Sequence, residues 1–304
     1  MSQKIGPTQV QTAPIALGCM RMGALEISKA EQVLTVALEH GINFFDHADI
    51  YGAGESERRF GQAVRNLGVE REKLLLQSKC GIRQGYYDFS KDYIIQTVEA
   101  SLERLGTDYL DFFLLHRPDV LMEPEEIAEA FSQLHKEGKV KYFGVSNQNR
   151  YQMELLQAYL EQPLVINQLQ LSPAHTILFD AGLNVNMTNQ AAIDRENGIV
   201  EYCRLNHVTI QVWSPFQIDL EQGLFMTDKR YKALAQTIEK YAERYHVSAE
   251  AIIIAWILRH PARMQAVIGS MNPERIDRIM QAQHISLTRA EWYDIYQSAG
   301  NKLP

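Results

Sequence analysis

Ionisable and hydroxyl-bearing side chains gather at the end of one short apolar run near the N-terminus. The run INFFDHA (42–48) contains Asp46 and His47, and Asp49 and Tyr51 follow within four residues. A connection between a strand and a helix needs a turn and a cap, which require fewer polar groups than this. We therefore expect part of this stretch to carry out chemistry.

Two further apolar runs end in an ionisable residue. LLLQSKC (74–80) carries Lys79 and DFFLLHR (111–117) carries His116. Taken singly, the aspartate could cap a helix, the lysine could extend to solvent and the histidine could be a hydrogen-bonded core residue. Three successive runs with ionisable ends favour a shared site.

The residue types Asp, Tyr, Lys and His suit proton delivery to a carbonyl group. A buried ammonium beside a phenol favours the phenolate, and so lowers the pKa of the phenol. A carboxylate keeps the lysine charged and in place, and a histidine can orient the carbonyl oxygen. Asp46, Tyr51, Lys79 and His116 could fill these four roles, with Tyr51 as the general acid. A hydride donor is still needed.

The elements that must position these residues follow a regular alternation. Apolar runs lie at 14–20, 42–48, 74–80, 111–117, 141–147, 164–170, 208–214 and 265–270, and helix-like segments lie at 28–40, 55–66, 91–105, 124–137, 149–161, 195–206 and 229–259. Continuous apolar runs are typical of strands buried on both faces of a parallel sheet. The pattern predicts an α/β fold, a (β/α)8 TIM barrel that forms a single domain over residues 1–304.

Two connections are unusually long for this fold. Residues 172–196 follow the sixth strand and residues 215–228 follow the seventh. One such loop alone would be explained as a surface insertion. Both would lie on the C-terminal face of a barrel, where βα loops build active sites, so we expect them to form a lid or a substrate wall.

Composition excludes several classes of protein. The net charge of −7 and the absence of a basic stripe argue against a nucleic-acid or anionic-membrane partner. Cys19, Cys80 and Cys203 are widely spaced, so neither a disulfide framework nor a zinc site is expected. The N-terminus has no apolar signal core, and AIIIAWIL (251–258) is too short to cross a bilayer. We expect a cytoplasmic protein without a bound metal, and the sequence leaves its oligomeric state open.

Six motifs in order resemble the aldo-keto reductase superfamily. They are DHADIYGAGESE (46–57), SKCG (78–81), LLHRPD (114–119), VSN (145–147), NQ (167–168) and IGSMNPERI (268–276). The resemblance runs from about residue 14 to residue 282, and the first and third motifs are most similar to a bacterial oxidoreductase subgroup. It implies a catalytic tetrad of Asp46, Tyr51, Lys79 and His116, and NADPH-dependent reduction of a small aldehyde or ketone to an alcohol.

The resemblance also implies the positions that hold the dinucleotide. The nicotinamide carboxamide would be bound by Ser146, Asn147 and Gln168. Trp213 would stack on the nicotinamide and is followed by Ser214 and Pro215, which open the segment 215–228 over the pyrophosphate. Ser270 and Arg275 would bind the 2′-phosphate of the adenosine. The alternatives are a core aromatic for Trp213 and a surface ion pair or cap for Arg275.

The sequence departs from the family pattern at several positions. Gly269 stands where many members carry a lysine for the 2′-phosphate, so the preference for NADPH over NADH rests largely on Arg275. We expect a structural hydrogen bond for His47 and a turn role for Asp49. Met20 and Met22 suggest an adaptable, apolar substrate site.

Two other functions are compatible with the same fold. A nicotinamide-binding regulatory subunit would keep the cofactor site with little turnover. A metal-dependent hydrolase would use His47, Asp49 and His116 as ligands, although no further carboxylate and histidine set has ligand spacing.

Overall fold

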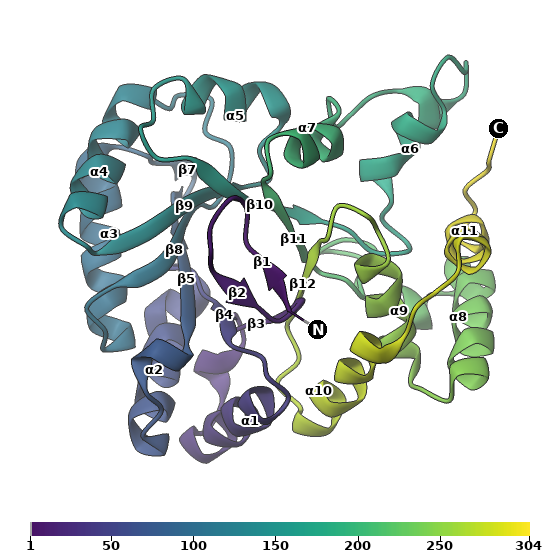
Figure 1. Ribbon diagram of the computed structural model, residues 1–304, viewed down its shortest axis with the longest axis horizontal. Helices are drawn as coiled ribbons and strands as arrows, with labels where there is room; N and C mark the ends of the chain where they lie inside the picture. The colour runs from purple at the N-terminus through teal and green to yellow at the C-terminus, as the bar shows by residue number, and fades with distance from the viewer. Residues whose placement is uncertain (1) are drawn as a thin grey trace.

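The computed structural model describes residues 2–304, and its centre is a closed barrel of parallel strands. Around the barrel the strands follow the order β10, β11, β12, β3, β4, β5, β8, β9 (Figure 1). Their bounds are β3 Ile15–Gly18, β4 Phe44–Asp46, β5 Leu75–Cys80, β8 Leu110–Leu115, β9 Val140–Ser146, β10 Leu164–Gln170, β11 Thr209–Trp213 and β12 Gln265–Ile268. Each predicted strand is present, and β12 pairs with β3 to close the barrel. The predicted TIM barrel is confirmed.

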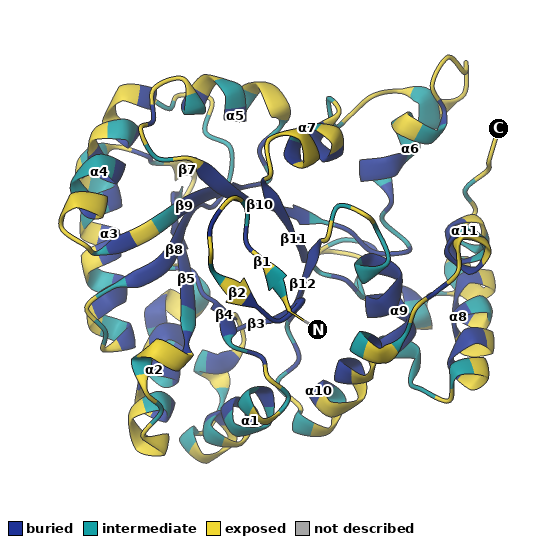
Figure 2. Cartoon of the chain, in the orientation of Figure 1, coloured by how far each residue is buried: buried dark blue, intermediate teal, exposed yellow. Residues whose placement is uncertain are grey.

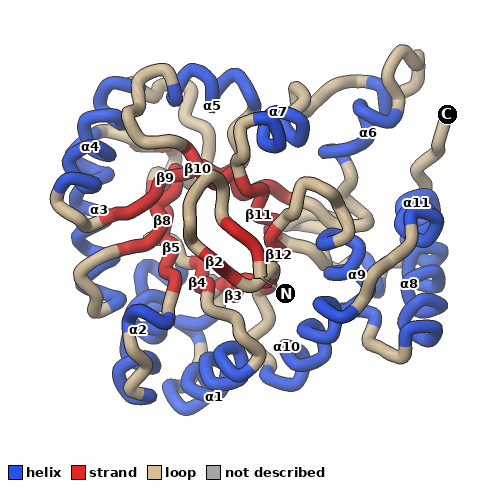
Figure 3. The backbone as a smooth tube through the Cα atoms, in the orientation of Figure 1, coloured by secondary structure: helices blue, strands red, loops and turns tan. Residues whose placement is uncertain are grey.

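Helices surround the ring of strands, as Figure 3 shows. They are α1 Ile27–Glu39, α2 Glu55–Leu67, α3 Lys91–Leu105, α4 Pro124–Lys136, α5 Arg150–Gln157, α6 Ile177–Leu183, α7 Ile199–Leu205, α8 Lys232–Tyr245, α9 Ala249–Leu258, α10 Pro273–Met280 and α11 Arg289–Ser298. The strands are buried and the outer helix faces are exposed (Figure 2). The strands can be apolar along their whole length because one face lies against the barrel interior and the other is covered by helices.

Two short hairpins accompany the barrel. The strands β1 Gln3–Lys4 and β2 Gln11–Thr12 pair antiparallel, and Figure 1 shows this hairpin across one opening of the barrel. Ile5 lies between them in sequence and packs with the inward-facing Phe44, Phe112 and Val165. The second hairpin, β6 Ile82–Arg83 with β7 Tyr86–Tyr87, follows β5. The first hairpin thus closes the end of the barrel away from the site described below.

Local signals explain several helix boundaries. Asn149 and Gln152 form a capping box at the start of α5, and Asn272 caps α10, which has Pro273 at its first position. The predicted helical segment 229–259 is two helices, because His246 adopts a left-handed conformation (φ 55°) after α8 and Ser248 caps α9. Within residues 2–304, no helix has the length and apolar character needed to cross a membrane.

Candidate active site

Strand alternation brings the ionisable residues to one end of the barrel interior. Successive side chains of a strand point to opposite faces, so inward-facing Leu75 is followed by Gln77 and then Lys79. Asp46 ends β4, His116 directly follows β8, and Tyr51 opens a 3-10 turn after β4. The structure therefore places all four predicted catalytic residues at the carboxyl ends of neighbouring strands.

Short contacts join the four side chains. Lys79 Nζ lies 2.6 Å from Asp46 Oδ1 and donates a hydrogen bond of 3.3 Å to Tyr51 Oη. It also donates to the backbone carbonyl of His47 at 2.8 Å, which fixes all three donors of the ammonium. The rings of Tyr51 and His116 meet edge to face, with centroids 5.9 Å apart. Tyr51 Oη thus has a cation on one side and an imidazole on the other.

The turn after β4 sets the direction of Tyr51. Gly52, Ala53 and Gly54 all have positive φ values, of 58°, 53° and 87°. Such a run is uncommon, and the alanine within it is held in a conformation that L-residues disfavour. At Gly54 an added Cβ would also lie 2.7 Å from Arg104 Cδ. The glycine-rich sequence GAGESE is therefore needed to bring Tyr51 over the barrel before α2 begins.

Burial controls the charge of these groups. Lys79 is fully buried and Asp46 is 2% exposed. Burial lowers the pKa of Lys79, but the charges of Asp46 and Tyr51 outweigh it, so the pKa is raised and the ammonium persists. For Tyr51 burial raises the pKa, and the opposing effect of Lys79 does not fully compensate. The lysine acts in the predicted direction, but the predicted net lowering of the phenol pKa is wrong for this structure because desolvation is larger.

His116 is neutral at ordinary pH. Burial, the Lys79 ammonium and the Arg117 guanidinium all hold the pKa of His116 well below its usual range. A neutral imidazole can donate one hydrogen bond to a carbonyl oxygen but is a poor source of a proton. This leaves Tyr51 as the group with a transferable proton beside a charged lysine.

A ladder of buried glutamines supports Asp46, and the sequence analysis missed it. Asp46 Oδ1 accepts hydrogen bonds from Gln77 at 2.5 Å and Gln168 at 3.1 Å. Both amides also donate to Gln211, which in turn donates to Gln265 at 2.9 Å. The available signal was a glutamine at an inward position in four apolar runs. These donors hold the Asp46 carboxylate in a fixed position against Lys79.

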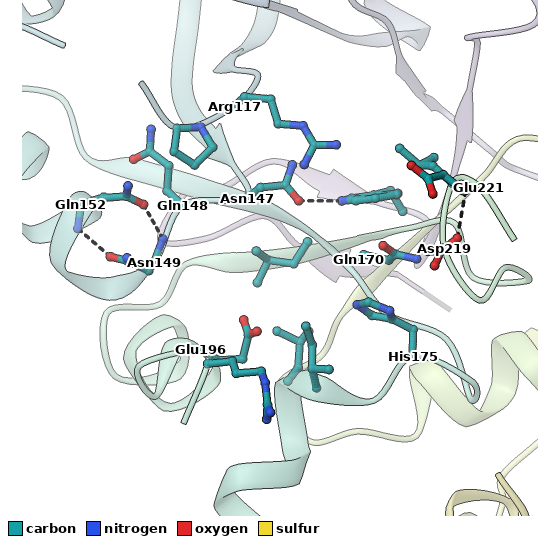
Figure 4. Close-up of a pocket in the computed structure, with 17 residues that line it drawn as sticks. Arg117, Asn147, Gln148, Asn149, Gln152, Gln170, His175, Glu196, Asp219 and Glu221 are labelled. Atoms are coloured by element: carbon teal, nitrogen blue, oxygen red, sulfur yellow. Dashed lines mark hydrogen bonds between the residues drawn. The ribbon is translucent and has the colours of Figure 1, made fainter. Parts of the chain in front are cut away.

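The predicted nicotinamide residues lie together at the ends of β9, β10 and β11. Asn147 has a positive φ of 58°, and its Nδ2 donates to Ser146 Oγ at 2.7 Å while its Oδ1 accepts from Trp213 Nε1 at 3.1 Å. Ser146 Oγ donates to the carbonyl of Gln168 at 3.0 Å. Figure 4 shows the bond that Asn147 accepts from the indole. Ser214 also has a positive φ, of 51°, where the chain turns into Pro215.

The predicted phosphate residues lie in the loop after β12 and the first turn of α10. Ser270 Oγ accepts a hydrogen bond from the backbone N–H of Asn272 at 3.3 Å. Arg275 Nε lies 3.3 Å from Glu250 Oε1, and its guanidinium lies 5.2 Å from the ring centroid of Phe216. The ion pair expected as the alternative for Arg275 is therefore present, with the side chain still about one-third exposed.

A second arginine stands beside Gly269 and was not anticipated. Arg21, in the loop after β3, donates from Nη2 to the carbonyl of Gly269 at 2.6 Å. A Cβ on Gly269 would lie 3.4 Å from this nitrogen. The position where many family members carry a lysine thus has a cation supplied by another loop.

The expectations for His47 and Asp49 have different outcomes. His47 is fully buried, its ring packs edge-on against Phe60 at 4.6 Å, and neither ring nitrogen has a hydrogen-bond partner within residues 2–304. The predicted structural hydrogen bond is therefore wrong, and burial with the Lys79 charge lowers the pKa of His47 to about 3. Asp49 is the turn residue expected, since it accepts from Ile50 N and from Tyr93 Oη, each at 2.8 Å.

Of the two methionines expected to wall the pocket, only one is open to a ligand. Met22 is fully buried in the core, whereas Met20 is 54% exposed. Across residues 2–304, no group of three His, Cys, Asp or Glu side chains is arranged to hold a metal ion.

A cavity of about 730 Å³ adjoins the nicotinamide residues (Figure 4). Asn147 and Trp213 belong to its wall, together with Arg117, which follows His116 in sequence. The connection after β10 contributes His175 and the connection after β11 contributes Asp219. Both long loops therefore line this cavity, and their role as a lid or substrate wall stays a prediction. The first loop contains the helix α6.

Comparison with known proteins defines the class that this barrel and site represent. Residues 14–299 match the model of the aldo/keto reductase family. The chain is 34% identical to the uncharacterized oxidoreductase YcsN of Bacillus subtilis, covering 97% of both sequences, and 33% identical to the oxidoreductase YdhF of Escherichia coli, covering 97% and 96%. It is 32% identical to a 6-dehydroglucose reductase of Agrobacterium fabrum, over 88% of this chain and 87% of that protein.

A solved structure supports the same fold. The crystal structure of a thermostable aldo-keto reductase superposes with a TM-score of 0.78 and 24% identity, over 98% of this chain and 99% of the other. The chain belongs to the aldo/keto reductase family. It is an oxidoreductase of that family, whose members use a nicotinamide dinucleotide.

Proposed function

We propose that this protein reduces a small aldehyde or ketone to an alcohol, with NADPH as hydride donor and Tyr51 as proton donor. One observation carries the proposal: Tyr51 Oη lies 3.3 Å from a buried Lys79 ammonium that is itself paired with Asp46 at 2.6 Å. A phenol held beside a permanent cation can release its proton to an alkoxide and remain stabilised as phenolate. The aldo/keto reductase family membership supports this chemistry.

Each of the four residues has a distinct task. Neutral His116 donates a hydrogen bond that orients the carbonyl oxygen toward Tyr51. Bound NADPH supplies a hydride to the carbonyl carbon. Tyr51 then gives its proton to the oxygen, and the positive charge of Lys79 stabilises the phenolate that results. Asp46, with its glutamine donors, keeps Lys79 charged and in place.

The described residues fit a nicotinamide dinucleotide. Ser146, Asn147 and Gln168 offer amide and hydroxyl groups for the carboxamide. The side-chain nitrogen of Gln168 already donates to Asp46 and Gln211, so its side-chain oxygen is the group that can accept a hydrogen bond from the cofactor. One face of Trp213 meets the Arg117 guanidinium at 5.5 Å, so a stacked ring must use the other face or displace the arginine. Ser214 and Pro215 begin the loop that would pass over the pyrophosphate.

We assign the 2′-phosphate of NADPH to Ser270 and Arg275, with Arg21 as a further cation. Three features favour this: the N-terminus of α10, the exposed third of Arg275, and the Arg21 guanidinium at Gly269. Helix N-termini and guanidinium groups both favour phosphate. The relatives named 6-dehydroglucose reductase support a small carbonyl compound as substrate.

The experiment is NADPH oxidation, followed by absorbance, with a panel of aldehydes, ketones and quinones. Tyr51→Phe should lower turnover by about 100-fold or more and leave NADPH affinity unchanged, because only the positioned acid is lost. Tyr93→Phe is the matched control: it removes a nearby phenol that bonds Asp49 instead, and turnover should stay within a few-fold. Activity should persist in a chelator.

Two results would contradict the proposal. Near-native turnover of Tyr51→Phe in single-turnover assays would exclude Tyr51 as the acid. Tight NADPH binding without oxidation by any compound of the panel would instead support a regulatory nicotinamide-binding subunit.

A further inference from the structure

Arg117 carries a positive charge that no group among residues 2–304 neutralises. It follows His116 directly and is half-buried in the wall of the cavity beside the nicotinamide residues (Figure 4). Within residues 2–304 its guanidinium has neither a hydrogen-bond acceptor nor a carboxylate at ion-pair distance, and it lies over the indole of Trp213, 5.5 Å from the ring centroid. By contrast, Arg195 in the same wall donates to the carbonyls of Gln190 and Ile193 at 3.2 and 3.1 Å.

The strand geometry explains where the guanidinium lies. His116 continues the inward-facing series of Phe112 and Leu114, so Arg117, one residue later, leaves the barrel interior and enters the adjoining cavity. His116 and Arg117 are neighbours in the chain, and Arg117 shares the cavity wall with Asn147 and Trp213, two of the predicted nicotinamide residues. A ligand whose carbonyl oxygen rests on His116 can therefore extend toward Arg117.

A second group in the cavity wall has unused hydrogen-bonding capacity. Gln148 is 1% exposed, and neither its amide nitrogen nor its amide oxygen has a partner within residues 2–304. Leaving a buried polar group unsatisfied costs about 1–3 kcal/mol, so such groups in native proteins usually have a reason. Gln148 and Arg117 line the same cavity, which indicates a site built for a polar ligand.

We propose that Arg117 determines substrate specificity by binding an anionic oxygen group, a carboxylate or a phosphate, on the carbonyl compound that the enzyme reduces. A guanidinium presents paired N–H donors that match the two oxygens of such a group. Gln148 lies in the same wall and supplies a further donor and acceptor to the polar tail. This inference rests on the proposed reductase function and deepens it by naming the substrate class, oxo-acids and similar anionic aldehydes or ketones.

Acidic residues in the cavity wall restrict where an anionic group can bind. Glu196, Asp219 and Glu221 also line it, and none of them is ion-paired with Arg117. Asp219 accepts backbone N–H groups of its own loop, from Glu221 at 2.9 Å and Gln222 at 2.6 Å. Burial and the charge of Asp194 raise the pKa of Glu196. An anion is therefore favoured beside Arg117 and disfavoured beside the carboxylates of Asp219 and Glu221.

The test compares substrates that differ in charge but hardly in shape. The pairs are 4-carboxybenzaldehyde with 4-nitrobenzaldehyde and succinic semialdehyde with butanal, assayed for kcat/KM with NADPH. The wild type should prefer the anionic member of each pair. Arg117→Gln should lower kcat/KM for the anionic member by about 10- to 100-fold, the scale of a lost charged hydrogen bond, and change the neutral member by less than about threefold.

Control variants separate recognition from folding and from overall charge. Arg117→Lys keeps the charge without the paired donors and should lose part of the preference. Arg204→Gln removes a positive charge on α7, outside this cavity, and should leave the ratio within each pair unchanged. Thermal unfolding of each variant shows whether the native fold is retained.

The failure of this inference can be told apart from failure of the proposed function. Reduction of neutral aldehydes with no preference for anions, or a preference that survives in Arg117→Gln, would overturn the role of Arg117 while keeping the reductase. If no carbonyl compound is reduced, calorimetry with benzoate still tests whether Arg117 binds a carboxylate. Binding to the wild type that is lost in Arg117→Gln supports it, and equal or absent binding in both overturns it.

Discussion

At the scale of the residue, desolvation and a few close charges decide which groups can move a proton. Tyr51, Lys79 and His116 are all largely buried, and burial opposes the charged form of each. Only Lys79 has a carboxylate at 2.6 Å, so only Lys79 remains charged. The lysine then lowers the pKa of Tyr51 against the effect of burial, and at the same time keeps His116 neutral.

This arrangement predicts the same direction of change, with different sizes, for two substitutions. A general acid works while protonated, so the rate should fall as pH rises through the pKa of Tyr51. Lys79→Met removes the charge that lowers this pKa, and should move the alkaline limb of the pH–rate profile to higher pH, with slower turnover. Asp46→Asn removes the carboxylate that keeps Lys79 charged, so the limb should move in the same direction. The shift should be smaller, because the direct effect of Asp46, which raises the pKa of Tyr51, is lost as well.

The measurement is kcat against pH for wild type and both variants with one aldehyde. Unmoved limbs in both variants would show that the three groups do not titrate as a coupled set, even if both variants are slow. NADPH affinity measured in parallel shows whether cofactor binding has changed instead.

Residue types and spacing were enough to select Asp46, Tyr51, Lys79 and His116, because ionisable residues are conspicuous at the ends of apolar runs. The contacts that these and neighbouring side chains make could not be predicted in the same way. His47 was expected to form a hydrogen bond, yet its ring packs against Phe60 of α2. The sequence shows that a histidine follows the strand, but not which side chain the next helix turns toward it.

At the scale of the element, periodicity predicted the strands better than the helix ends. The predicted run 14–20 is the strand β3 Ile15–Gly18, and the predicted segment 229–259 is the two helices α8 and α9. The apolar pattern continues across the break between α8 and α9, so the pattern alone does not show where one helix ends and the next begins. The missed helix α11 has a readable signal, since Thr288 and Glu291 form a capping box.

Close packing of two helices gives a prediction at this scale. Gly61 of α2 faces α3, where an added Cβ would lie 2.5 Å from the carbonyl oxygen of Leu105. Ala gains about 1 kcal/mol over Gly in helix propensity, but forcing backbone apart costs about 1–3 kcal/mol. Gly61→Ala should therefore lower the midpoint of urea unfolding.

Gly182→Ala in α6 is the matched control, because an added Cβ there meets nothing within 4 Å. It should leave the midpoint unchanged or raise it slightly. Equal midpoints for Gly61→Ala and wild type would mean that α2 and α3 can separate without cost.

At the scale of the whole molecule, barrel closure joins segments that the sequence separates widely. β12 pairs with β3, and this pairing brings Arg21 to within 2.6 Å of the Gly269 carbonyl. The register of β10 and β11 likewise aligns Gln168 with Gln211. These contacts depend on the order and register of the strands. Apolar periodicity predicts that a barrel forms, but it does not predict which residues of neighbouring strands are paired. The motifs predicted the candidate site, whereas the contacts of Arg21 and of the glutamines depend on closure of the barrel.

The proposed 2′-phosphate site, where these distant segments meet, gives a prediction about the choice of dinucleotide. NADPH differs from NADH by the 2′-phosphate, so a cation that binds this group should affect NADPH alone. Arg275→Ala should weaken NADPH binding by about 1.5–3 kcal/mol, roughly 10- to 100-fold, and leave NADH binding nearly unchanged. Arg275 also has a competitor, Glu250, at 3.3 Å. Glu250→Gln should therefore release the guanidinium and tighten NADPH binding.

Arg21 supplies the internal comparison, because it stands at Gly269 where a lysine is missing. If both arginines bind the phosphate, Arg21→Ala should also weaken NADPH selectively, and the double variant should bind NADPH and NADH alike. Fluorescence titrations of the four variants with each dinucleotide measure this. Equal losses for both dinucleotides would place the 2′-phosphate elsewhere, and the Glu250 pair would then serve only to fasten α10 to α9, with Phe216 as a packing contact.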